Sequence, residues 1–158
     1  MNDKLYLFNP FVLKKVEDNN EIAKLYSEVF NTLLEDPNTM YEYAHNIEVY
    51  SNLNYILGEV IARLTKDLIE LKTKIEINKA IHMVDERKRW EKEEVIKTPA
   101  MSYFEALGTR FCEEDIKLLA QKESDLKRFK NAYQSTEEKL NALKKKMESI
   151  KFEEFNEN

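Results

Sequence analysis

An apolar heptad pattern between Met40 and Ile75 limits the folds open to this sequence. Asn54 fills its one polar position, no proline interrupts it, and Gly58 lies off the pattern. Such a run is typical of a helix that buries one stripe against other helices, and here it would extend roughly 54 Å. The apolar positions are Met40, Tyr43, Ile47, Tyr50, Leu57, Ile61, Leu64, Leu68, Leu71 and Ile75.

A second heptad pattern follows a break at Ile96–Ala100, where Pro99 disfavours a helical conformation at Thr98. Two long heptad helices joined by a proline break predict an all-α fold built on an antiparallel helical hairpin. The second pattern, in which Lys122 takes one position, consists of Leu119, Leu126, Phe129, Tyr133, Thr136, Leu140, Leu143, Met147 and Ile150.

Three capping-box spacings predict where helices begin: Asp18 with Glu21, Thr39 with Glu42, and Ser102 with Glu105. We expect an N-terminal arm and a short helix over 1–38, and the hairpin over 39–158 with its break near 96–101. The last helix is expected to pause near Gly108. The arm, apolar from Leu5 to Leu13, would pack either on its own chain or on a partner subunit.

Apolar residues outside the heptad positions predict a homo-oligomer, because a wide stripe needs more than one partner helix. They include Leu53, Ile56 and Val60. Past Ile75 the apolar stripe shifts phase, so that the helix turns a new face to its partner or leaves the bundle. The shifted positions are Ile77, Ile81 and Val84.

Composition restricts the function classes. The 158 residues carry a net charge of −5, so a nucleic-acid site would have to be a local patch or a ring built by oligomerisation. A single cysteine, Cys112, predicts no disulfide and favours a reducing cytoplasm, with Cys112 as a packed thiol. We expect no signal peptide and no membrane span.

Catalysis finds little support, and we predict no enzyme activity, cofactor or metal. His45 and His82 are 37 positions apart on one predicted helix, which is roughly 55 Å. Phosphate loops, nucleophile elbows and zinc-protease patterns are missing from the sequence. The acids at Glu93–Glu94 and 113–115 are interpreted as solvated helix faces.

A basic stretch around a single tryptophan is the candidate nucleic-acid site. Cations beside an aromatic ring suit a single strand, because the charges follow phosphates and the ring stacks on a base. The alternative is a solvated face, since six acids are interleaved with the cations and Trp90 would simply cap the bundle. The candidate residues are Lys72, Lys74, Lys79, Arg87, Lys88, Arg89, Trp90 and Lys92.

The segment 41–51 resembles the start of the long helix in the bacteriophage recombination mediators, the UvsY-like family. The likeness extends over residues 40–150 and includes Lys97-Thr98 in the break. A Lys-x-Arg pair of that family aligns near Glu76–Asn78, so it cannot be carried over to this chain. The matching residues are Tyr41, Glu42, Ala44, Asn46, Tyr50 and Ser51.

The resemblance implies a small all-helical protein that forms rings, binds single-stranded DNA, and helps a phage recombinase displace the single-strand-binding protein. It implies no chemistry and a place in the host cytoplasm. Ring assembly would fall to the last helix, at Leu126, Phe129, Tyr133, Leu140, Leu143, Met147 and Ile150.

A helical protein–protein adaptor is the alternative function, for example a phage structural or host-factor-binding protein without a nucleic-acid role. The acidic net charge and the aromatic N-terminal arm favour it.

Overall fold

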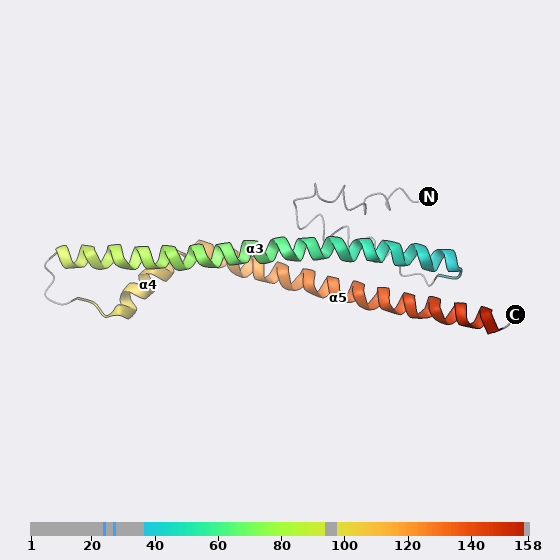
Figure 1. Cartoon of the computed structure of the whole chain (residues 1–158). Helices are drawn as coiled ribbons and strands as arrows, with labels where there is room; N and C mark the ends of the chain where they lie inside the picture. Colours follow the sequence, from blue (N-terminus) through green and yellow to red (C-terminus); the bar gives the residue numbers. More distant parts are fainter. Residues whose placement is uncertain (1–23, 25–26, 28–36, 94–97, 157–158) are drawn as a thin grey trace. The chain divides into compact units, whose positions relative to one another are not determined.

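The computed structural model describes residues 24, 27, 37–93 and 98–156, with the backbone alone for 154–156. Within these ranges the helices are α3 (Met40–Lys92), α4 (Met101–Phe111) and α5 (Glu113–Asn156), shown in Figure 1. The described residues contain no strand, which confirms the all-α prediction. The predicted arm, the Asp18–Glu21 capping box and the short N-terminal helix fall on residues outside this description.

The capping box predicted at Thr39 is present at the start of α3. The Glu42 amide donates to Thr39 Oγ1 at 3.2 Å, and the Thr39 amide donates to Glu42 Oε2 at 3.1 Å. The Asn38 amide also donates to Glu42 Oε2, at 2.7 Å. These bonds satisfy amides at a helix start that have no partner within the helix, so α3 begins where its sequence predicts.

The capping box predicted at Ser102 was wrong. The N-cap of α4 is Ala100 in an extended conformation, without a side-chain cap, and Ser102 lies inside the helix. The pause predicted near Gly108 was also misplaced, because α4 continues to Phe111 and the break falls at Cys112, with φ −95° and ψ 15°. Gly108 is instead buried where α4 approaches α3.

The chain divides into two compact units, and both long helices contribute to each. Unit 1 contains residues 37–62 and 127–156 of the described ranges, and unit 2 contains 63–93 and 98–126. In unit 2 the α3–α5 contacts join Asp67 to Lys122 at 2.8 Å and Lys74 to Asp115 at 2.8 Å. In unit 1, Gly58 faces the Tyr133 ring and Lys146 lies over the Tyr43 ring.

Both heptad patterns form the buried stripes that the sequence predicts. Every heptad position from Met40 to Ile75 is buried or half-buried, and so is every position from Leu119 to Ile150. The small core of unit 2 combines Leu71, Ile75 and Cys112 with the half-buried Ile116 and Leu119. The two helices therefore bury their stripes within one chain.

The apolar positions outside the heptad pattern behave differently in the two units. Leu53, Ile56 and Val60 are buried in the single chain, and the homo-oligomer inferred from them stays a prediction. Ile77, Ile81 and Val84 are exposed in unit 2. Ile69, which precedes the phase shift, is exposed as well, so the uncovered apolar surface of α3 in unit 2 extends to both sides of Ile75.

Candidate nucleic-acid interface

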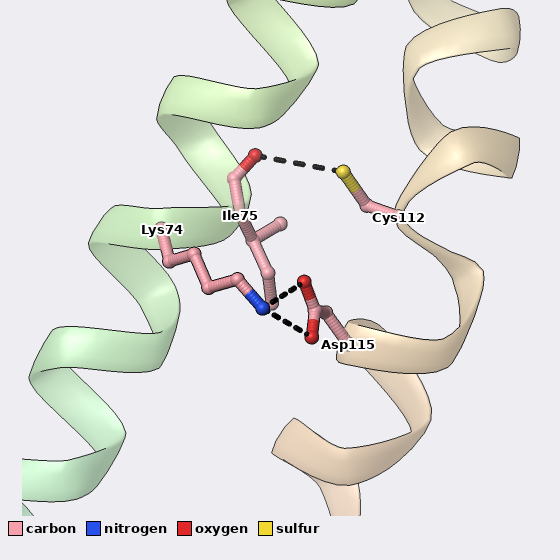
Figure 2. Close-up of polar contacts among 4 residues, drawn as sticks. All are labelled: Lys74, Ile75, Cys112 and Asp115. Carbon is pink, nitrogen blue, oxygen red and sulfur yellow. Dashed lines mark hydrogen bonds and ion pairs between the residues drawn. The ribbon is translucent and has the colours of Figure 1, made fainter.

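Two of the predicted DNA-binding lysines are engaged in packing the helices of unit 2. Lys74 donates from Nζ to both carboxylate oxygens of Asp115, at 2.9 and 2.8 Å, as Figure 2 shows. Lys72 pairs with Glu123 at 2.7 Å. An acid on α5 therefore neutralises each charge. These lysines join α3 to α5 rather than presenting free cations to a phosphate.

The same close-up places Cys112 beside this ion pair. Its Sγ lies 3.8 Å from the carbonyl oxygen of Ile75, and the side chain is buried (Figure 2). The prediction of a packed thiol is confirmed. Cys112 thus serves the core of unit 2 at the break between α4 and α5.

Lys79 occupies the contact between α3 and α4. A Cβ built on Gly108 would lie 3.1 Å from the carbonyl oxygen of Lys79 and 3.2 Å from Cγ of Met83. The absence of a side chain at Gly108 permits this close approach of the two backbones. Lys79 itself is half-buried, so its position is set by helix packing.

The last turns of α3 carry the remaining predicted cations, and acids on the same helix bind two of them. Arg87 pairs with Glu91 at 3.1 Å, and Arg89 pairs with Glu93 at 3.3 Å. Residues 85–93 contain four cations and four acids, so the formal charge of this segment is zero. Lys88 and Lys92 are exposed, and neither makes an ion pair with any residue that the structure describes.

Trp90 contacts a residue that sequence reasoning missed. Its ring meets that of Tyr103 edge to face, with the centroids 6.1 Å apart, and Tyr103 in turn meets the buried Phe104 at 5.6 Å. The side chain of Tyr103 is 43% exposed. The adjacent aromatic residues Tyr103 and Phe104, shortly after Pro99, are visible in the sequence. The neighbouring sequence does not predict that Tyr103 packs against residue 90.

A pocket of about 230 Å³ opens beside this aromatic group in unit 2. It is open to solvent and combines one guanidinium with apolar walls. The lining residues are Arg87, Thr98, Pro99, Met101 and Phe104.

The predicted oligomerisation residues lie mostly inside unit 1. Phe129, Leu140 and Leu143 are buried within the single chain. The others, Tyr133, Met147 and Ile150 in unit 1 and Leu126 in unit 2, are half-buried. Little of this stripe remains for a contact with another subunit.

The residues considered for chemistry have structural surroundings. His82 stacks on Phe111 with centroids 4.4 Å apart. Glu113 accepts a hydrogen bond from Lys117, which lowers the pKa of the carboxyl and raises the pKa of the ammonium. No cluster of three or more potential metal ligands occurs among the described residues. None of the described helices has the length and apolarity needed to cross a membrane.

No protein-family model matches the chain, and neither a curated protein nor a solved structure matches it. The structure does show what the residues behind the UvsY-like resemblance do here. Glu42 caps α3, Asn46 and Tyr50 are buried, and the Ser51 hydroxyl donates to the Ile47 carbonyl at 2.7 Å. Tyr41 and Ala44 are exposed, so the matching residues divide between the start, the buried face and the surface of α3.

Proposed function

We propose that this chain binds single-stranded DNA as a non-enzymatic accessory protein of phage recombination. In this proposal it acts as an oligomer that promotes loading of a recombinase in place of the single-strand-binding protein, in the host cytoplasm. The observation that carries it is the exposed Tyr103 ring held against Trp90, with Lys88 and Lys92 on the same end of α3.

An exposed ring fixed by a second ring suits base stacking. Stacking of a base on an aromatic side chain contributes about 1–3 kcal/mol and tolerates any base. The edge-to-face contact with Trp90 holds Tyr103 in place, so stacking would cost little side-chain entropy. Lys88 and Lys92 are exposed and form no ion pair with any described residue, so they can bind phosphates without breaking one.

The likeness to the phage mediators supports the same proposal through the fold. We include in it an antiparallel hairpin of α3 and α5. The α3–α5 contacts support this arrangement, because Lys74 follows Asp67 on α3 while its partner Asp115 precedes Lys122 on α5. Tyr43 and Gly58 show the same reversal with Lys146 and Tyr133. Among the residues of the resemblance, Glu42 caps the start of α3, and Asn46 and Tyr50 are buried.

Fluorescence anisotropy with a labelled single strand and a matched duplex, each at low and moderate salt, tests the proposal. We expect salt-dependent binding that prefers the single strand, and a loss of about tenfold in affinity for Tyr103→Ala. Tyr55→Ala removes an equally exposed ring from unit 1 and serves as the control. The absence of binding at low salt would reject the function, whereas equal losses in both variants would reject only the site.

The second candidate function is a helical protein–protein adaptor, and one observation favours it. Isoleucine and valine side chains at Ile77, Ile81 and Val84 are exposed on one face of α3. Exposed aliphatic residues gathered on one face are characteristic of protein interfaces. Co-purification of a different protein, together with no DNA binding at low salt, would select this function.

A further inference from the structure

The outer face of α3 in unit 2 carries an apolar stripe that nothing in the described chain covers. Ile69, 62% exposed, lies at one edge of this face, and three large aliphatic side chains at its centre are at least half exposed: Ile77 at 53%, Ile81 at 55% and Val84 at 50%. At 100° per residue, the centre of the last three lies roughly 150° around the helix from the buried line of Leu68, Leu71 and Ile75. The stripe therefore faces away from the helix packing of unit 2.

This stripe has the spacing of a second coiled-coil seam. Thr73, Ile77, Ala80 and Val84 follow one another at intervals of four, three and four residues, and all four are exposed. The same spacing continues into charged residues on both sides. These residues are Lys66 and Glu70 before the apolar centre, and Arg87 and Glu91 after it.

The charges at the two ends of the seam have the same order along the sequence, a cation followed four residues later by an acid. Lys66 pairs with Glu70 at 3.7 Å, and Arg87 pairs with Glu91 at 3.1 Å, so each end presents a cation and an acid side by side. From the apolar centre toward the N-terminal end of the seam, the order is Glu70 and then Lys66. Toward the C-terminal end, the order is Arg87 and then Glu91. Each end is therefore complementary to the other.

We propose that this seam packs against the same seam of a second copy of the chain, antiparallel and about a twofold axis. In this register Ile77 faces Ala80 of the second copy, and Thr73 faces Val84 of the second copy. The twofold axis makes each of these contacts occur twice. Outside this apolar centre, Glu70 opposes Arg87 and Lys66 opposes Glu91.

The charge order selects both the partner and the direction. A parallel pairing would oppose each charge to its own copy, Glu70 to Glu70 and Arg87 to Arg87, which is repulsive. A protein of unrelated sequence would match this charge order only by chance, whereas a second copy of the chain matches it at every charged position of the seam. The proposed contact supplies the oligomer of the proposed function through α3, but it stands on these residues alone and does not require DNA binding.

Sedimentation equilibrium of the full chain over a range of concentrations, without DNA, measures the contact directly. We expect a dimer that Ile77→Asp weakens at least about tenfold, because the twofold axis places two buried carboxylates in the seam. Tyr55→Asp, a half-exposed position of α3 in unit 1, should leave the mass unchanged. Circular dichroism on each variant checks that the helices persist.

Charge exchange tests the register independently of the apolar centre. Glu70→Arg alone and Arg87→Glu alone should each weaken the dimer about tenfold, because each creates two like-charge contacts. An equimolar mixture of the two variants should recover the dimer, since every opposed pair is then again a cation with an acid. The double variant should recover it as well.

Three results would overturn the proposal. A wild-type chain that stays monomeric up to about 1 mM excludes the contact. A dimer that survives Ile77→Asp lies on another surface. A monomeric chain that captures a different protein through Ile77 assigns the stripe to the adaptor function instead. Because no DNA is present, each result is separate from failure of the DNA-binding proposal.

Discussion

Lys122 of α5 donates a hydrogen bond from Nζ to Oδ2 of Asp67 on α3, at 2.8 Å. Lys122 holds one position of a heptad pattern whose other members are nearly all apolar, and its side chain is largely buried between the helices. Asp67 meets this charge from the facing helix. A lysine that interrupts the pattern in the sequence thus has an electrostatic partner in the fold.

Removal of either partner should destabilise unit 2. We expect Lys122→Ala and Asp67→Ala each to lower the free energy of unfolding by about 0.5–1 kcal/mol, because each leaves a partly buried charge unpaired. Urea unfolding measures this loss. The double variant should lose less than the sum of the two single losses, which is the sign of direct coupling.

The exposed pair Arg89–Glu93 is the control for that cycle, since it joins residues four positions apart at the end of α3. Its coupling energy should be close to about 0.3 kcal/mol. Equal coupling in the two pairs would mean that burial between α3 and α5 adds nothing to the Lys122–Asp67 contact.

Two of the three predicted capping boxes, at Thr39 and Ser102, provide a matched test of helix starts. Thr39→Ala removes the acceptor of the Glu42 amide and should cost about 1 kcal/mol. Ser102→Ala should change stability by less than about 0.5 kcal/mol, because Ser102 lies inside α4 and caps nothing. Thermal unfolding of both variants decides the point, and a larger loss at Ser102 would contradict the assigned start of α4.

The two glycines should respond in opposite directions to alanine. At Gly58 an added Cβ meets the Tyr133 ring at 3.7 Å and no other atom of the described residues, so Gly58→Ala should gain about 0.5–1 kcal/mol from helix propensity. At Gly108 the same Cβ lies 3.1 Å from a backbone carbonyl of α3, which cannot move without shifting the helix. We expect Gly108→Ala to lose about 1 kcal/mol in denaturant unfolding. A gain there would show that α4 adjusts freely against α3.

The pair Glu113–Lys117 should stabilise the fold only between acid and strongly basic pH. The hydrogen bond from Lys117 lowers the pKa of Glu113 below 4.5, so its contribution is present above that value and disappears as pH falls through the lowered pKa. The pKa of Lys117 is raised above 10.5, so its contribution is present below that value and is lost as pH rises through the raised pKa.

Glu113→Gln should therefore lower the thermal midpoint slightly at neutral pH and leave it unchanged once Glu113 is protonated. Both groups are exposed, so the difference is small and should shrink in high salt. A deficit that persists in strong acid would point to lost packing rather than lost charge.

The salt dependence of DNA binding separates the two sets of lysines. Lys88→Ala with Lys92→Ala should reduce the slope of log affinity against log salt by about 1–2, because each phosphate contact contributes about 0.7 on a single strand. Lys72→Ala with Lys74→Ala should leave the slope unchanged and lower stability, since those lysines bind Glu123 and Asp115. A reduced slope for the Lys72 and Lys74 variant, with an unchanged slope for the Lys88 and Lys92 variant, would assign the DNA contact to Lys72 and Lys74 instead.

The heptad periodicity of apolar residues predicted the helices and their buried stripes. Residues at this spacing lie on one face of a helix, and that face is the one that becomes buried. The helix start at Thr39 was also predictable, because its capping box joins residues only three positions apart. Ser102 has the same spacing, but α4 begins one residue before it, which the local sequence does not reveal. The break at Cys112 escaped prediction because Gly108 is the residue expected to interrupt a helix, whereas here it serves a close helix contact.

The candidate site was predictable only in part, because its contacts join residues far apart in sequence. Basic character near Trp90 was visible, but the acids that pair with Lys72 and Lys74 lie more than forty positions away. Tyr103 was missed for the same reason, since its contact with Trp90 depends on how α4 packs. The exposure of Ile77 and the burial of Leu53 likewise follow from tertiary packing rather than from the pattern.

The sole tryptophan of the chain, Trp90, lies in unit 2. Its indole emission therefore reports the environment of that unit alone, whereas ellipticity at 222 nm averages over helices in both units. If the two optical transitions coincide during unfolding, the long helices couple the units into one cooperative block. If the indole transition comes first, unit 2 opens while unit 1 remains folded, and the end of α3 that carries Trp90 can rearrange without loss of the rest.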